Sequence, residues 1–162
     1  MSEPGDGHGR HATAVVFGEW GVLILGPAGS GKSALALALL ARARVSGLFG
    51  ALIGDDRIWL EARNGRLAAR GAPQTAGMIE RRAVGILTAP VESEAVIRLA
   101  AELCPADHLP RLPEGSERLE IAGLTVPLIQ LSLSQSASDN ALAVEEIVHA
   151  MLQVQQEKAN FA

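Results

Sequence analysis

The chain has 162 residues with a formal net charge of −4, and 48% of them are hydrophobic, which suits one domain with a sizeable core. The negative charge argues against a nucleic-acid binder held by bulk electrostatics, and no apolar run approaches the roughly 18 residues of a membrane span. The one cysteine, Cys104, excludes an intrachain disulfide and a multi-cysteine metal site, and it fits a reducing cytoplasm.

The first third of the chain predicts a hairpin followed by a helix. Residues 1–10 are polar and glycine-rich, so we expect a loose tail there. Residues 11–17 form the first strand candidate, and the turn signal at 18–21 leads into a second, wholly apolar strand at 22–25. Strong helix formers then predict a helix over 32–44.

A phosphate-binding loop of the form G-x-x-x-x-G-K-S lies between that strand and that helix, where its mechanism requires it. Glycines let backbone N–H groups approach phosphate oxygens, and the helix N-terminus adds positive field. Lys32 would reach the β- and γ-phosphates of a nucleotide, and the Ser33 hydroxyl would bind Mg²⁺. A lysine at this position is not a mere consequence of composition, because the chain has only two lysines, Lys32 and Lys158. The loop consists of Gly26, Pro27, Ala28, Gly29, Ser30, Gly31, Lys32 and Ser33.

An acidic pair, Asp55-Asp56, follows the next apolar strand, residues 49–53. A carboxylate at the end of such a strand can face the metal or the nucleophile of a phosphate-loop site, although a solvated turn has the same composition. Residues 57–62 alternate in polarity and lead to Asn64-Gly65, a strong hairpin signal. The acidic pair is therefore expected at the root of a β-hairpin, where a simple nucleotide kinase would have a crossover helix.

The middle of the chain leaves two alternatives open. Residues 78–82 have the composition of one helical turn, in which Glu80 is either part of a solvated salt-bridge cluster or a metal ligand beside a phosphate clamp. Residues 95–103 suit a helix or a strand. We interpret Cys104 and His108 as structural.

The last part of the chain predicts a second hairpin and a terminal helix. The hairpin is expected over 118–133, and residues 132–140 are polar, so we expect them to be poorly ordered. Residues 141–155 have the spacing of an amphipathic helix, with a C-terminal tail over 156–162.

Taken in order, these segments resemble the catalytic C-terminal domain of the HPr kinase/phosphorylase family. The likeness spans about residues 11–150, and the ordered combination is far more specific than the phosphate loop alone. It is carried by His11 before the loop, the loop and its strand, Gly54-Asp55-Asp56-Arg57-Ile58 against A-D-D-R-V, Glu80-Arg81-Arg82-Ala83-Val84-Gly85-Ile86 against E-I-R-G-L-G-I, Arg111-Leu112 against D-R-L, and Val126-Pro127-Leu128-Ile129 against V-P-x-I.

The resemblance implies an α/β P-loop kinase domain over residues 11–155, with a mixed sheet similar to that of phosphoenolpyruvate carboxykinases. It implies a serine kinase that uses ATP and Mg²⁺ to phosphorylate HPr, a phosphocarrier protein of sugar transport, and thereby regulates carbohydrate metabolism. In the family the reverse reaction is phosphorolysis and the assembly is a hexamer. No nucleic-acid or membrane partner is implied.

Residue roles follow from the resemblance position by position. Asp56 takes the proton from the attacking serine, and Lys32 and Arg111 stabilise charge on the transferring phosphoryl group. His11 and Arg82 shape the site, with Arg82 as a phosphate clamp, although a histidine at the start of a strand is as often a packing or capping residue. The resemblance assigns Mg²⁺ to Ser33, Glu80 and Asp55.

The chain also departs from the family pattern. It resembles a short form without the family's N-terminal domain. The C-terminal P-G-R-N-L segment is replaced by residues 137–141, which contain no arginine, so we expect a competent kinase and a weak phosphorylase unless Arg57, Arg81 or Arg118 takes its place.

Two other functions remain open. A small-molecule kinase would need an arginine-bearing lid, for which no helical insert is apparent. A regulatory module that binds ATP without transferring phosphate is compatible with the missing arginine.

Overall fold

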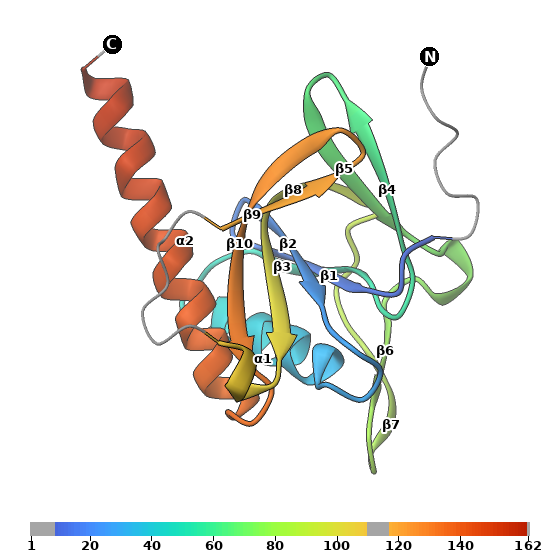
Figure 1. Cartoon of the computed structure of the whole chain (residues 1–162). Helices are drawn as coiled ribbons and strands as arrows, with labels where there is room; N and C mark the ends of the chain where they lie inside the picture. The colour runs from blue at the N-terminus through green and yellow to red at the C-terminus, as the bar shows by residue number, and fades with distance from the viewer. Residues whose placement is uncertain (1–8, 110–116, 162) are drawn as a thin grey trace.

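The centre of the sheet is a pair of parallel strands, β2 (Trp20–Leu25) and β8 (Glu94–Cys104). The computed structural model describes residues 9–109 and 117–161 (Figure 1). On one side of β2 lie β1 (Thr13–Phe17) and then β3 (Gly50–Gly54), both antiparallel to their neighbours. On the far side of β8 lie β10 (Leu124–Ser132), which is parallel to it, and β9 (Arg118–Ile121). The predicted mixed sheet of an α/β fold is therefore present.

The predicted hairpin at Asn64-Gly65 connects β4 (Ile58–Arg63) to β5 (Arg66–Gly71). Both turn residues have positive φ, +53° and +73°, which is the conformation that this dipeptide favours in a two-residue turn. β5 pairs with the first residues of β8, whose later residues pair with β2 and β10. One long strand thus joins the hairpin to the central sheet.

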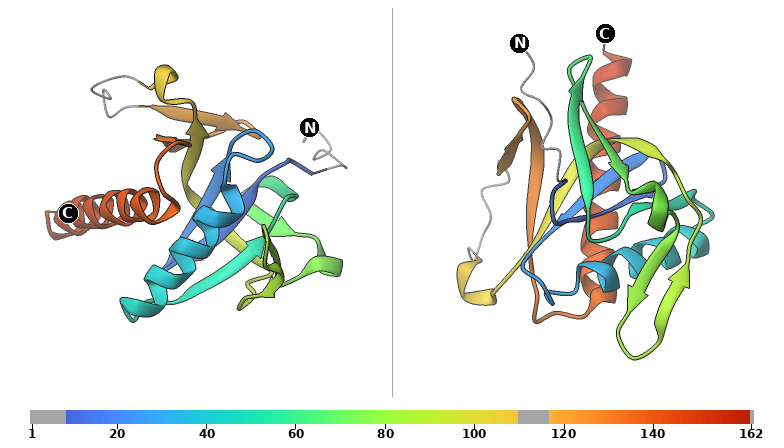
Figure 2. Two further views of the ribbon diagram at one scale, coloured as in Figure 1. Left: turned by 90° about the horizontal axis from the view of Figure 1, so that it is seen from below. Right: turned by 90° about the vertical axis from the view of Figure 1, so that its right-hand side faces the viewer.

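Two helices cover one face of the sheet: α1 (Lys32–Val45) and α2 (Ala137–Asn160). Figure 2 shows them next to one another, and the buried Glu145 of α2 accepts hydrogen bonds from Arg42 and Ser46 of the α1 end. The pair joins the C-terminal end of α1 to the first half of α2.

Successive side chains of a strand point to opposite faces of the sheet, so a hydrophobic core forms on each face. Val22 and Ile24 of β2 pack with the two helices, whereas Leu23 and Leu25 pack against residues of the β4–β5 and β9–β10 hairpins. All four side chains are buried, and each contributes about 1.5–3 kcal/mol by leaving water. β2 is therefore fixed from both sides, and the phosphate-binding loop begins where it ends.

A separate two-stranded ribbon, β6 (Met78–Arg81) and β7 (Gly85–Thr88), extends beside α1. The prediction of a helical turn over residues 78–82 was wrong. Ile79 is 1% exposed and faces Leu87 across the ribbon, and both contact the core under α1. Burial of this apolar pair outweighs the local helix preference.

Residues 95–103, for which the sequence left helix and strand open, lie in the strand β8. Element boundaries differ from expectation at both ends of the chain. Ser136 caps α2 by accepting a hydrogen bond from the Asp139 N–H at 3.1 Å, so an ordered helix begins within the segment expected to be low in order. α2 continues to Asn160, although a tail was expected from residue 156. At the other end, Arg10 bonds through its backbone to Ile58, so the ordered chain begins before residue 11.

Short 3-10 turns occupy Pro73–Thr75 and Ala106–His108. In the part of the chain that the structure describes, neither helix is long and apolar enough to cross a membrane.

Candidate active site

The phosphate-binding loop presents backbone N–H groups to a pocket. Gly29 and Gly31 have φ of +76° and +100°, and a side chain at either would meet only open space. No side chain caps the N-terminus of α1 at Gly31, and its first turn contains no acidic residue. Such a helix start, preceded by left-handed glycines, is a binding site for an anion.

Lys32 lies at the bottom of this loop and is 7% exposed. Its ammonium donates hydrogen bonds to the carbonyl oxygens of Gly26 at 2.9 Å and Pro27 at 3.1 Å. Burial lowers the pKa of Lys32 from its usual value of 10.5, and the nearby carboxylates of Asp56 and Asp55 act in the opposite direction. The charge is thus held inside the loop, next to the position that a bound phosphate would take.

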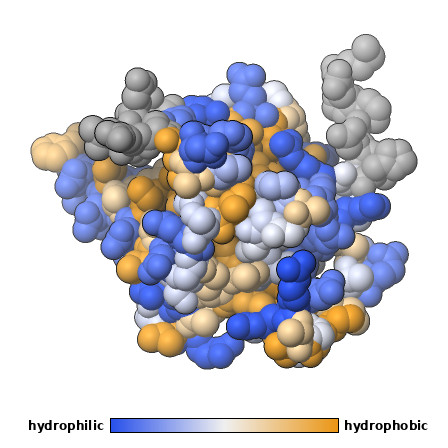
Figure 3. Space-filling model, turned by 60° about the horizontal axis from the view of Figure 1, so that its bottom comes forward, coloured by the Kyte–Doolittle hydropathy of each residue, from blue (hydrophilic) through white to orange (hydrophobic). Residues whose placement is uncertain are grey.

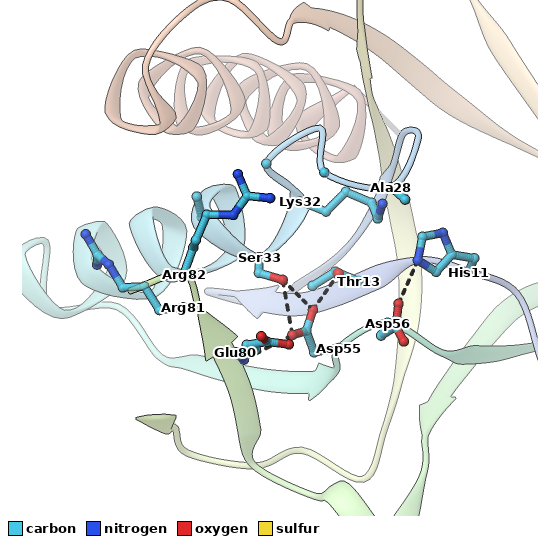
Figure 4. A pocket seen from close by; sticks show the side chains of 13 residues that line it. His11, Thr13, Ala28, Lys32, Ser33, Asp55, Asp56, Glu80, Arg81 and Arg82 are labelled. Atoms are coloured by element: carbon cyan, nitrogen blue, oxygen red, sulfur yellow. Dashed lines mark hydrogen bonds and ion pairs between the residues drawn. The ribbon is translucent and has the colours of Figure 1, made fainter. Parts of the chain in front are cut away.

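Asp55 connects three elements. Its carboxylate accepts hydrogen bonds from the Ser33 hydroxyl at 2.9 and 3.1 Å and from the Thr13 hydroxyl at 2.8 Å. The backbone N–H of Glu80 also points to it, at 3.4 Å. Asp55 therefore fixes the serine of the phosphate loop relative to the end of β3 and to the β6–β7 ribbon (Figure 4).

Thr13 is a site residue that sequence reasoning missed. It is fully buried on β1, and its hydroxyl holds Asp55 in one orientation. Threonine is common in strands, so the sequence does not mark Thr13 as a site residue. Its distinguishing feature is a fully buried hydroxyl that faces an acidic residue, and only the fold shows this.

Asp56 has a different partner. His11 Nε2 lies 2.6 Å from Asp56 Oδ1, and the two side chains are 50% and 79% exposed. Asp56 has φ of +71°, a left-handed conformation that aspartate tolerates better than most residues. This kink turns the two neighbouring carboxylates in different directions, one to Ser33 and the other to His11 (Figure 4).

These groups surround a pocket of about 590 Å³, within the range of ligand sites. Figure 4 shows the Glu80 carboxylate next to Asp55, with Arg82 reaching over Ser33. Gly26 and Pro27 instead line a second pocket of about 410 Å³, and Arg111 lies outside the described residues. The larger pocket brings together most of the predicted site: His11, Ala28, Gly29, Gly31, Lys32, Ser33, Asp55, Asp56, Glu80 and Arg82, with Thr13, Ala34 and Arg81 in addition.

The donor set fits Mg²⁺ bound together with a phosphate chain. Within residues 9–109 and 117–161, no three His, Cys, Asp or Glu side chains are placed to hold a metal ion on their own. Mg²⁺ needs no such cage, because it commonly takes one or two carboxylates and completes its shell with phosphate oxygens and water. Ser33, Asp55 and Glu80 offer oxygen ligands of this kind at the mouth of the loop.

The residues considered for phosphorolysis, the reverse reaction, lie partly inside and partly outside the larger pocket. Residues 137–141 form the first turn of α2 and do not line the pocket. Of the three arginines named as substitutes, Arg81 lines it, while Arg57 and Arg118 do not.

Cys104 and His108 lie at the second pocket. Burial raises the pKa of the Cys104 thiol, whose sulfur lies 3.8 Å from the Leu131 carbonyl oxygen. A protonated, buried thiol is consistent with a structural role.

The known proteins to which this chain is similar are HPr kinases. The family model of the HPr Serine kinase C-terminal domain matches residues 6–161. An HPr kinase/phosphorylase of Mycoplasma mycoides subsp. mycoides SC is 32% identical over 142 residues, which cover 80% of this chain and 43% of that protein. The chain thus spans less than half the length of this curated relative.

Among solved structures, the Hpr(Ser) kinase/phosphatase from Coxiella burnetii superimposes with a TM-score of 0.76 at 27% identity. The match covers 91% of this chain and 97% of that one. The similarity confirms the predicted α/β fold with a mixed sheet.

Proposed function

The chain belongs to the family of the HPr serine kinase C-terminal domain, and from this membership we propose that it transfers the γ-phosphoryl group of ATP to a serine of an HPr-like phosphocarrier protein. The observation that carries the proposal is the bond between Ser33 and Asp55. It connects the phosphate loop to an acidic pair whose second member, Asp56, is free of that loop and faces His11. In phosphate-loop enzymes, this serine and an acidic residue together hold the metal beside the nucleotide.

The loop and Lys32 hold the phosphates of ATP in this proposal. The N–H groups at the start of α1 receive the β-phosphate, and Lys32 exchanges its hydrogen bonds to Gly26 and Pro27 for phosphate oxygens. Ser33, Asp55 and Glu80 hold Mg²⁺, which supplies positive charge to offset that of the β- and γ-phosphates.

Asp56 acts on the acceptor. The serine oxygen forms a bond to the γ-phosphorus while the bond from that phosphorus to the bridging oxygen of ADP breaks, and the serine proton passes to the Asp56 carboxylate. His11 holds that carboxylate by its contact at 2.6 Å. A positioned base of this kind contributes on the order of 10²–10⁴ in rate. Arg82 and Arg111 are assigned to the oxygens of the transferring group.

The test is incubation with labelled ATP, Mg²⁺, purified HPr and a panel of small phosphate acceptors, using the wild type, Lys32→Ala and Asp56→Asn. We expect label on a serine of HPr with the wild type only, and ATP binding retained by Asp56→Asn. Label on a metabolite would instead indicate a small-molecule kinase. Bound ATP with no label anywhere would indicate a regulatory module.

By the same resemblance, we propose a cytoplasmic role in regulating carbohydrate metabolism and assembly into a hexamer. The assembly is tested by sedimentation, where a monomer at working concentration would contradict it.

A further inference from the structure

The β6–β7 ribbon has two unlike faces. Glu80 pairs with Ile86 and Ile79 with Leu87 across the ribbon, so each pair shares a face. Ile79 and Leu87 contact the core under α1, which places Glu80 and Ile86 on the opposite face. The face that brings Glu80 to the pocket therefore continues directly to Ile86.

Met78 and Ile86 are the apolar side chains of that outer face, and Val84 lies in the adjoining turn. Ile86 is 70% exposed, Val84 62% and Met78 45%. None of these three side chains lines the pocket, although Glu80, Arg81 and Arg82 of the same ribbon do. Figure 3 shows hydrophobic surface gathered at the lower right, where the ribbon ends, beside strongly hydrophilic residues. A cluster of exposed apolar side chains at the rim of a charged pocket is typical of an interaction surface.

The tip of the ribbon is a tight turn. The Val84 N–H donates to the Arg81 carbonyl oxygen at 3.1 Å, and Ala83 has φ of +66°. Among the described residues, no ion pair involves Arg81 or Arg82. Arg81 pairs with Gly85 on the face of Ile79 and Leu87, and it lines the pocket, so the tip adds positive charge beside the outer face.

We propose that the outer ribbon face of Met78 and Ile86, together with Val84 and Arg81 of the adjoining tip, is the docking surface for the protein that supplies the acceptor serine. The inference rests on the proposed function. A ligand confined to the pocket cannot contact these three apolar side chains, whereas a protein segment whose serine enters the pocket must pass over its rim. The segment that fits carries apolar side chains beside the serine and an acidic side chain opposite Arg81.

The test compares Ile86→Ser with Val45→Ser. Val45 is 88% exposed at the last position of α1 and lines neither pocket, so it is a matched control for loss of an exposed apolar side chain. With HPr as acceptor, Ile86→Ser should raise the KM for HPr about tenfold while leaving the KM for ATP and kcat unchanged. Val45→Ser should match the wild type in all three.

Charge is tested separately with Arg81→Ala. This variant should raise the KM for HPr and weaken its dependence on salt, because an exposed cation attracts its partner through a screened interaction. Arg66→Ala, on the tip of the β4–β5 hairpin, is the control.

Titration of HPr without ATP separates this inference from the proposed function. If the wild type binds HPr but does not phosphorylate it, the proposed function fails, and weaker binding by Ile86→Ser still supports the docking surface. Equal HPr affinity of Ile86→Ser and the wild type would overturn the inference. So would a change in sedimentation mass without a change in HPr affinity, because the face would then bind a second copy of the chain.

Discussion

Asp55 and Asp56 are adjacent in the chain, but their environments differ, in agreement with the proposed roles of metal ligand for Asp55 and base for Asp56. The Asp55 carboxylate accepts hydrogen bonds from two hydroxyl groups, those of Thr13 and Ser33, and has little freedom to move. The Asp56 carboxylate is largely exposed and has one partner, His11, so an acceptor can reach it. The positive φ of Asp56 produces this division. Sequence reasoning could place both aspartates at the site but could not derive the kink that separates them.

In the proposed function, the alkaline limit of ATP binding should depend on Lys32. Burial lowers the pKa of Lys32 from 10.5 and Asp56 acts against that shift, so removing the Asp56 charge should lower the pKa further. Only the ammonium binds phosphate well, and it is lost as pH rises through this pKa. The alkaline midpoint of ATP binding should therefore lie at lower pH in Asp56→Asn than in the wild type, measured as the Kd of a fluorescent ATP analogue against pH.

Glu19→Gln removes a carboxylate at the β1–β2 turn, outside the pocket, and should leave that midpoint unchanged. If Asp56→Asn and Glu19→Gln gave the same midpoint, Asp56 would not be acting on Lys32.

Glu80 is the second carboxylate that we propose as a ligand of Mg²⁺. A neutral amide is a poorer ligand for a hard cation, so Glu80→Gln should raise the Mg²⁺ concentration for half-maximal transfer by about tenfold. The same titration with Glu92→Gln, a neighbour beyond β7, should match the wild type. An unchanged Mg²⁺ requirement in Glu80→Gln would leave Glu80 only the role of a surface charge.

At the scale of elements, the turn between β6 and β7 carries strain. Ala83 has φ of +66°, and the left-handed region costs a residue with a Cβ roughly 1–2 kcal/mol. Ala83→Gly should therefore raise the free energy of unfolding by about 1 kcal/mol in urea denaturation, after the added flexibility of the unfolded chain is subtracted. Ala62→Gly, on the exposed part of β4, should change stability in the opposite direction. A loss of stability in both variants would show that the turn is not strained.

Most elements could be predicted because their signals are local. Asn64-Gly65 specifies its own turn, and the run of helix formers after Lys32 predicts α1. The ribbon could not be predicted, because what makes residues 78–81 a strand is the contact of Ile79 with Leu87 and with α1. The start of α2 was predictable in principle: Ser136 and Asp139 have the spacing of a capping pair, and the two side chains are hydrogen-bonded at 2.8 Å.

At the scale of the whole molecule, the two helices are joined by a charge pair that the sequence does not suggest. Glu145 is 6% exposed and accepts hydrogen bonds from Arg42 and Ser46. Glu145→Ala would leave the Arg42 side chain, which is 38% exposed, without its partner. We expect a loss of roughly 1–3 kcal/mol in the free energy of unfolding. The double variant Glu145→Ala/Arg42→Ala should lose less than the sum of the single variants.

The exposed pair of Arg63 and Glu61 is the control for this measurement. Its removal should leave the urea midpoint unchanged, because solvent and salt screen such pairs. An additive result for Arg42 and Glu145 would mean that the helices are held by apolar contacts alone.

The strand β8 has a consequence for the way this protein is made. Gly21 of β2 pairs with Ile97 of β8, so one edge of the loop-bearing hairpin has no partner until residues 94–104 have left the ribosome. At about 5–20 residues per second, a nascent chain spends several seconds with that edge open. An unpaired strand edge binds other chains readily. The newly made first half should therefore depend on chaperones, and the arrival of one late strand sets the time at which the kinase-like site can form.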